Sequence, residues 1–554
     1  MESWPAVRLV YDSEDLIGYW RARDRLRLQI VAWARRRGEF VEPSLVAAAL
    51  DHKHSVDGRL GHWTRAHIAD ALAVWFPRTV ALLEEDRPAV PAALHAVIGF
   101  LAEQDWLDSR SDPPEELHAQ IEDSTPALHD ACADERNLDL GTFWAVQMLR
   151  HRVPTADPVA VSRFLAQVDA GEIEIDRAAL EEITRRQAEP PEPEPTAFPP
   201  VVLPSAAALL AAADASPALA RLRAFTRWVR AGRPLRNGRL LLEDARAVAE
   251  LLDVDHFSRT RARSAEDLPE VSLIMDWALQ SRLVRVVKGR LVPVKSAAPL
   301  LSRPIELWQR LFSAVGGLGE HFGGTNVFGA PSLFGMPLGD ALQLLLGLLY
   351  SAGGDPVPVE RFHRLVRDTV NEEMGCVVDD LAGDVEQRLW RRDVTALLDA
   401  LELLGAVELG ESPDGIEEHE ALVALAGRDD PDPTLVSLTP IGIWAVREML
   451  IEQGEIAPLA GELADEDIEY VIVKSAPLRA EVADAELSAW VAARPRRQAA
   501  SEIMRLLQRL EDGPHRELAL RALAKTGDSA PPPQRRAPSS SGPRVDCHVR
   551  ARRG

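Results

Sequence analysis

The segment AEPPEPEPTAFPPVVLP, residues 188–204, constrains the fold of this chain more than any other stretch. Proline has no backbone N–H and favours extended polyproline II, so neither a helix nor a central strand can run through this segment. Glu189, Glu192 and Glu194 keep it solvated. We therefore predict a semi-rigid spacer that separates an N-terminal domain from the rest of the 554 residues.

The stretch before the spacer has apolar residues at intervals of three and four, the period of an amphipathic helix. The pattern recurs in RARDRLRLQIVAWARRRGEF, RAHIADALAVWF, PAALHAVIGFLAEQDWL, LGTFWAVQML and DPVAVSRFLAQV. In the first of these, arginines occupy one helical face and Leu26, Ile30 and Trp33 the other, which is typical of an ordinary surface helix. This region is predicted to be all-α.

The stretch after the spacer alternates helical and β-rich patterns. LLLEDARAVAELL and LPEVSLIMDWALQ are helical, SRLVRVV and LVPVK flank the turn KGR, and PIELWQRLFSAV is helical again. Helix, helix, hairpin and helix together predict a winged-helix-like unit. A second such order follows, with the long helix DVEQRLWRRDVTALLDALELLG, the strand AVELG, a long acidic wing loop and the returning strand in TLVSLTPIGIWAVREML.

The predicted fold class is therefore mainly α and multidomain, with small β-hairpins. Successive amphipathic helices near the C-terminus resemble a short repeat of the HEAT type. We hypothesise that a frameshift replaced the next repeat, because a mixture of Arg, Pro and Ser follows abruptly. The predicted parts are an all-α domain at 1–187, a Pro/Glu-rich linker at 188–204, winged-helix-like units at 205–315 and 340–455, a Gly/Phe-rich connecting loop at 316–339, a HEAT-like segment at 465–525 and a disordered basic tail at 526–554.

Composition limits the possible functions. The formal net charge is -23, so a nucleic-acid site would have to be a local basic patch. Cys132, Cys376 and Cys547 are too few and too far apart for a disulfide framework or a four-thiolate zinc site. No run of 18 apolar residues and no signal-peptide pattern occurs, so we expect a cytoplasmic protein without a membrane partner.

Three stretches resemble uncharacterised proteins of high-GC, actinobacterial-type bacteria: DGRLGHWTRAHIADALAVWFPRTV, NGRLLLEDARAVAELL and LVRVVKGRLVPVK. Some of those proteins are related to plasmid open-reading-frame-three-like proteins of mobile elements. The resemblance covers about the first two thirds of the chain and implies no catalytic residues. It implies a genomic neighbourhood more than a mechanism.

The stretch DHKHSVDGRLGHWTRAH holds the densest set of possible metal ligands: His52, His54, Asp57, His62 and His67. Zinc needs three or four ligands converging on one point. His52 and His54 are two apart and would diverge by about 200° on a helix, and no His-x-x-x-His pair supports them. We interpret them as surface and capping histidines and predict no metal site. A metal-dependent hydrolase is the alternative, and it requires His52, His54, Asp57 and His62 to converge.

The remaining motifs indicate no chemistry. The loop GGLGEHFGGTNVFGAPSLFGMPLG has neither the Gly-Lys-Ser/Thr of a nucleotide loop nor the strand context of a dinucleotide fingerprint. Asp51 and Lys53 match the Asp-x-Lys end of a metal-dependent nuclease core, but they end a helical run instead of a strand. No serine or cysteine stands in a nucleophile-elbow setting. We predict a non-enzymatic protein with no cofactor.

The hairpin at 281–295 is the strongest candidate for nucleic-acid contact. It carries Arg282, Arg285, Lys288, Arg290 and Lys295 and no acid. The helix before it offers Glu270, Asp276 and Gln280 and no basic residue, whereas a DNA-reading winged helix normally presents a basic one.

In the second unit, the basic and acidic residues lie on different elements. Arg388, Arg391 and Arg392 lie on its long helix, but its wing is acidic. We therefore favour a scaffold or protein-interaction role with a protein partner. The alternative is a DNA-binding regulator associated with a mobile element. In that alternative, the five basic hairpin residues and the three arginines of the long helix contact the DNA backbone.

Overall fold

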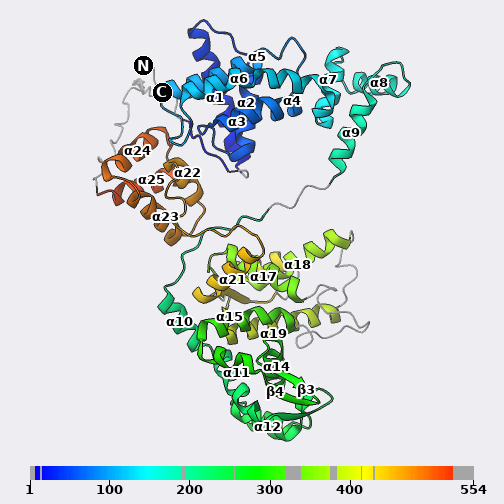
Figure 1. Ribbon diagram of the computed structural model, residues 1–554, viewed down its shortest axis with the longest axis vertical. Helices are drawn as coiled ribbons and strands as arrows, with labels where there is room; N and C mark the ends of the chain where they lie inside the picture. Colours follow the sequence, from blue (N-terminus) through cyan, green and yellow to red (C-terminus); the bar gives the residue numbers. More distant parts are fainter. Residues whose placement is uncertain are drawn as a thin grey trace, which may run out of the picture. The chain divides into compact units, whose positions relative to one another are not determined.

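The computed structural model describes residues 7–12, 15–189, 195–254, 256–318, 338–374, 384–413, 415–427 and 431–527 (Figure 1). It is mainly helical with small antiparallel sheets, which confirms the predicted class at that level. Most of the predicted connecting loop and nearly all of the basic tail lie outside these residues. Among the described residues, no helix combines the length and apolar character needed to cross a membrane.

The chain forms two compact units that do not follow the spacer exactly. Unit 1 contains Met1–Pro190, Leu463–Leu478 and Ala483–Gly554, and unit 2 contains Pro191–Glu462 and Arg479–Val482. The HEAT-like segment, which the sequence treats as a part of its own, therefore belongs almost entirely to the same unit as the N-terminal helices. Nothing in its local periodicity indicates this.

Unit 1 is built of helices. They are α1 (Leu16–Arg36), α2 (Pro43–Asp57), α3 (Arg65–Asp70) continued by a π-helical turn (Ala71–Trp75), α4 (Phe76–Thr79), α5 (Ala89–Glu103), α6 (Pro114–Ala133), α7 (Leu140–Arg150), α8 (Pro158–Asp169), α9 (Arg177–Ala188), α22 (Ile468–Ser475), α23 (Ala480–Ala492), α24 (Arg496–Arg509) and α25 (Pro514–Lys525). Leu26, Ile30 and Trp33 of α1 are buried, on the face that the sequence assigned to the core.

Polar contacts join the early and late segments of unit 1. Leu9 donates its backbone N–H to the buried carboxylate of Glu469 on α22. Arg59 forms ion pairs with Asp108 at 3.1 Å and with Glu466 at 2.7 Å, and its guanidinium lies over the ring of Tyr470. The carboxylates of Asp108, Glu466 and Glu469 are mostly buried, and their bonds fix the register between the two segments.

Unit 2 contains two modules with small sheets. Module 1, which we define as residues 217–303, has α11 (Pro217–Trp228), β1 (Arg233–Arg236), β2 (Arg239–Leu240), α12 (Leu242–Leu251), α13 (His256–Arg261), α14 (Pro269–Gln280), β3 (Val284–Val287) and β4 (Arg290–Pro293). Module 2, residues 338–462, has α17 (Leu338–Ser351), β5 (Val357–Pro358), α18 (Val359–Met374), α19 (Asp384–Leu404), β6 (Val407–Glu411), α20 (Ile416–Ala426), β7 (Thr434–Leu438) and α21 (Pro440–Glu452). Helices α10 (Ala206–Ala215) and α15 (Pro304–Ala314) complete the unit.

The two modules share one strand topology. The sheet orders are β2-β1-β4-β3 and β5-β7-β6, so in each module the first strand pairs antiparallel with the last, which pairs with the strand before it. The hairpin predicted at 281–295 is present as β3 and β4. The β1–β2 hairpin was not predicted, and neither was α20 within the second wing.

The second half of the predicted spacer is docked against unit 2. Phe198 donates its N–H to Ile456 O at 2.7 Å, and Ala460 donates to Val201 O at 2.9 Å, as in a short parallel ladder. The Phe198 ring packs edge-on against Tyr350. Proline has no N–H to donate, so this stretch pairs through the N–H groups of Phe198 and Val201, which bond to Ile456 O and Pro458 O. Residues 196–201, which the sequence predicts to be part of a semi-rigid spacer, are thus hydrogen-bonded to residues 455–460 of the same unit.

Trp308 on α15 joins the two modules in one hydrophobic core. Its side chain is fully buried, its ring stacks on Phe312, and its indole N–H donates to Leu404 O on α19 at 2.9 Å.

We predict that Trp308→Ala destabilises both modules together, by about 3–5 kcal/mol, because a large cavity opens in a shared core. Hydrogen exchange should then become faster in α14 and in α19. Trp20→Ala, at a half-exposed tryptophan of unit 1, is the control. Faster exchange in only one module would contradict a shared core.

Candidate functional site

Two tight hairpins form the basic surface of module 1. Asn237 and Gly238 join β1 to β2 with φ of 52° and 78°, and Lys288 and Gly289 join β3 to β4 with φ of 49° and 72°. Two consecutive positive φ values define a type I′ turn, whose twist matches that of paired strands. The Asn-Gly dipeptide is the strongest short hairpin signal in a sequence, and it could have revealed the first hairpin.

The strand register gathers four arginines on one face of this sheet. Arg236 lies opposite Arg239, and Arg290 lies opposite Val287 and Pro234. Directly paired residues and residues two apart on a strand share a face. We call Arg236, Arg239, Arg285 and Arg290 the arginine face. The opposite face carries Leu235, Leu240, Val284 and Leu291 toward the core.

The arginine face is largely open to solvent. Arg236, Arg285 and Arg290 are exposed, and no acid among the described residues pairs with any of them. Arg290 donates to Gly232 O at 3.0 Å. Arg239 pairs with Asp276 of α14 at 3.1 Å, so the unpredicted hairpin neutralises one of the two acids that the sequence places on this helix.

Arg282, Lys288 and Lys295 extend the same basic surface along the predicted hairpin, and all three are exposed. Arg391 and Arg392, by contrast, lie on α19 of module 2, where Arg392 pairs with the buried Asp393 at 2.9 Å. The side chain of Arg388 lies outside the described residues. The structure thus brings together the five hairpin residues and leaves the α19 arginines on another module.

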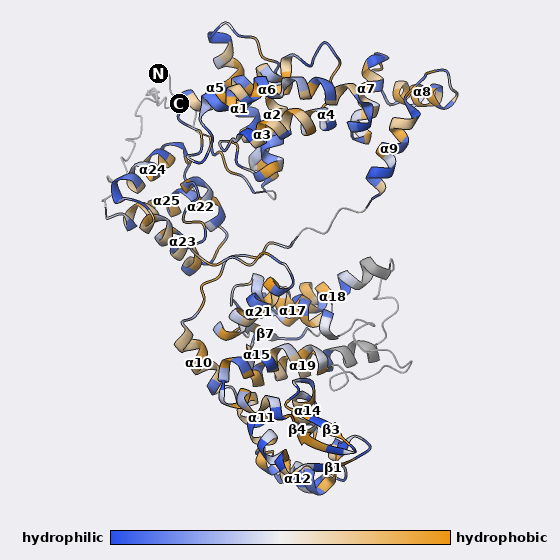
Figure 2. Ribbon diagram, viewed as in Figure 1, coloured by the Kyte–Doolittle hydropathy of each residue, from blue (hydrophilic) through white to orange (hydrophobic). Residues whose placement is uncertain are grey.

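The charge of unit 2 is strongly divided. Module 1 has 17 Arg and Lys against 9 Asp and Glu, a net charge of +8. Module 2 has 8 Arg and Lys against 26 Asp and Glu, a net charge of -18. Figure 2 shows hydrophilic and hydrophobic residues side by side along the β1–β4 sheet, as expected for strands with one buried face. An acidic chain therefore contains one clearly basic module.

The histidine-rich stretch does not assemble as the hydrolase alternative requires. His52 is fully buried, with Nε2 at 3.0 Å from a carboxylate oxygen of Asp70. His54 stacks on the Tyr19 ring, with 3.7 Å between the ring centroids. Asp51 accepts from Tyr19 and Arg23. These side chains serve the packing of α1, α2 and α3, and the four predicted hydrolase ligands do not converge.

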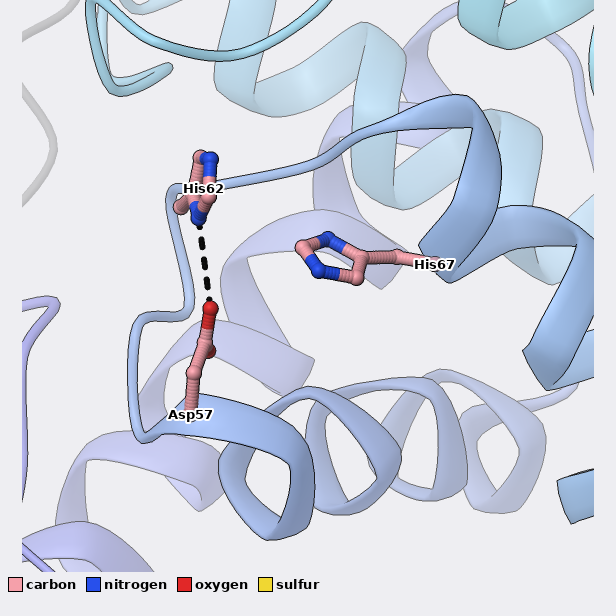
Figure 3. A group of neighbouring side chains, drawn as sticks. All are labelled: Asp57, His62 and His67. Carbon is pink, nitrogen blue, oxygen red and sulfur yellow. Dashed lines mark hydrogen bonds and ion pairs between the residues drawn. The ribbon is translucent and has the colours of Figure 1, made fainter.

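Asp57, His62 and His67 do come together (Figure 3), a grouping that the sequence did not single out. One potential ligand atom from each lies within 4.8 Å of the others. The reason is local: Asp57 ends α2, His67 lies in the first turn of α3, and the tight connection between them returns the chain upon itself.

The hydrogen bonds of this cluster favour a carboxylate held by donors over a cation site. Asp57 accepts from Lys53 Nζ at 2.5 Å, from the Arg59 N–H at 2.9 Å and from His62 Nδ1 at 3.2 Å. Nδ1 of His67 accepts the Thr64 N–H in a capping box, so the ring proton of neutral His67 is on Nε2. A protonated ring nitrogen cannot coordinate a metal.

Burial and neighbouring charges shift the pKa values in the cluster. Burial lowers the pKa of Lys53 to about 8, although Asp57 opposes the shift. Burial alone would raise the pKa of Asp57, but the hydrogen bond from His62 and the charge of Lys53 bring it to about 2. Burial and the Lys53 charge lower the pKa of His67 to about 4. At neutral pH the cluster is a carboxylate beside an ammonium, with His67 neutral.

The comparisons with known proteins give no relative of this chain. No family model, no curated protein and no solved structure matches it.

The neutral His67 makes stability depend on pH. Its folded-state pKa lies below the unfolded value of about 6.5, so the unfolded chain binds more protons between pH 6.5 and 4, and stability falls as the pH falls through that window. His67→Asn keeps a side-chain acceptor for the Thr64 N–H, and we predict a shallower loss of stability over this window. Urea midpoints at pH 6.5 and 4.5 measure it. The exposed His151→Asn is the control, and equal slopes in wild type and His67→Asn would contradict the prediction.

Proposed function

We propose that the chain is a non-enzymatic interaction protein, that its two modules are of the winged-helix type, and that module 1 binds the phosphate backbone of duplex DNA. The repeated strand topology supports the winged-helix assignment, because that fold also pairs its first strand with the last strand of its hairpin. The single observation that supports DNA as the ligand is the arginine face on a module of net charge +8.

Backbone binding needs cations on a surface that a duplex can approach, and no base-reading helix. The arginine face meets this need, since both hairpins present arginine beside their turns. Helix α14 exposes Glu270 and Gln280 and has no basic residue, so the proposed contact is through the sheet and carries little sequence preference. This role fits the cytoplasmic location expected from the sequence.

Module 2 supports a second role. Its charge of -18 repels a polyanion, so its surface suits a protein partner, in line with the scaffold function expected from the sequence. The two roles are compatible, because one module would hold nucleic acid while the other holds protein.

The test is a fluorescence-anisotropy titration of the full chain with a random-sequence duplex at about 0.15 M salt. We predict measurable binding that Arg236→Ala/Arg285→Ala weakens about tenfold or more. The slope of log affinity against log salt should become shallower by up to about 1.8, or about 0.9 for each phosphate that is no longer neutralised by an arginine.

The matched control is Arg361→Ala/Arg364→Ala, which removes two exposed arginines from α18 of module 2. It makes the same change in net charge and should leave affinity nearly unchanged. Absence of binding by the wild type would refute the nucleic-acid role, and equal losses in both variants would show that only the overall charge matters.

A further inference from the structure

A cavity of about 390 Å³ lies within unit 1, between the N-terminal segment, α1 and the turn from α24 to α25. Its volume is within the range of small-molecule sites. Four arginines and a histidine line it: Arg8, Arg21, Arg25, Arg509 and His515. None of these residues belongs to module 1 or to the histidine cluster.

One buried donor of an arginine that lines this cavity lacks an acceptor. Nη1 of Arg509 is buried and has no hydrogen-bond partner among the described residues, while Nη2 holds Glu469 at 2.9 Å. Nη1 of Arg8 lies 3.3 and 3.5 Å from the two ring nitrogens of His515, and the unprotonated nitrogen of the neutral ring accepts from it. Buried donors are normally satisfied, so the unpaired Nη1 of Arg509 indicates a missing oxygen ligand or water.

The backbone adds positive potential at the same place. Gly513, Pro514 and His515 form the start of α25, which has no side-chain cap, and they line the cavity. The first N–H groups of a helix and its dipole attract an anion. This helix end therefore acts together with the arginines of two other segments.

The acids at the cavity are already engaged. Asp15 pairs with Arg8 and caps α1, Glu511 pairs with Arg25 at 3.4 Å, and Asp512 pairs with Arg516 at 3.5 Å. All three acids are considerably exposed, so their field is screened by water. Arg21 is exposed at the rim, with no ionic partner among the described residues.

We propose that this cavity binds a small phosphate-bearing molecule. A phosphate group has several acceptor oxygens that point in different directions, so one group can accept from Arg8, Arg509 and the start of α25 at the same time. Arg21 at the rim then contacts a second phosphate or adds to the attraction. A flat carboxylate offers only two oxygens in one plane and satisfies fewer of these donors.

The probe is inorganic pyrophosphate, titrated calorimetrically into the full chain at constant ionic strength. We expect binding with a dissociation constant below about 1 mM, weakened at least fivefold by Arg21→Ala/His515→Gln, in which the glutamine amide oxygen still accepts from Arg8. Arg35→Ala, on the same helix but away from the cavity, is the control and should bind as the wild type does.

Hydrogen exchange separates this site from the arginine face, which also attracts anions. Pyrophosphate should slow exchange at the start of α25 and leave β3 and β4 unchanged, and this readout stands even if a variant folds poorly. Absence of binding, protection confined to the β3–β4 hairpin, or equal affinity of the double variant and the wild type would each overturn the proposal. The result is independent of whether module 1 binds DNA.

Discussion

Glu469 is almost fully buried, and its carboxylate holds together two stretches of unit 1 that are 460 residues apart in sequence. One oxygen accepts the Leu9 N–H and the other pairs with Arg509. Removing one member of a buried charged pair typically costs about 3–5 kcal/mol, because the other charge stays buried without compensation. The segment that begins at Val7 and helices α22–α25 therefore fold as one body, and that contact positions the arginines of the cavity in unit 1.

The sequence predicts the elements of this protein better than their assembly. Helices with strict periodicity, such as α1 and α24, and the hairpin around Lys288 and Gly289 follow from local pattern and turn chemistry. The packing of α22–α25 with the N-terminal helices in one unit depends on contacts between residues that are distant in sequence. The periodicity of each helix does not predict such contacts. The docking of residues 195–204 is similar, because its hydrogen-bond partners lie more than 250 residues away.

The candidate sites follow the same rule. The five basic residues of the predicted hairpin are visible in the sequence, but the arginine face needs the register that places Arg236 and Arg239 beside them. Among the histidines, His52 and His54 contact different partners, the Asp70 carboxylate and the Tyr19 ring. The grouping of Asp57, His62 and His67 depends on how one short connection folds back, and the chemistry of the group depends on which nitrogen of His67 receives the Thr64 N–H.

The packing of Trp308 determines how the divided charge of unit 2 acts in an electric field. Because this buried tryptophan joins both modules in one core, the positive and negative modules move as one body, and unit 2 has a permanent electrostatic dipole. In the field of a polyanion such a body experiences a torque as well as a net force. For the duplex proposed as ligand, this torque turns module 1 toward the DNA within roughly one Debye length, about 8 Å at physiological salt. Orientation is then settled before the first hydrogen bond forms, and fewer encounters fail because of a wrong approach angle.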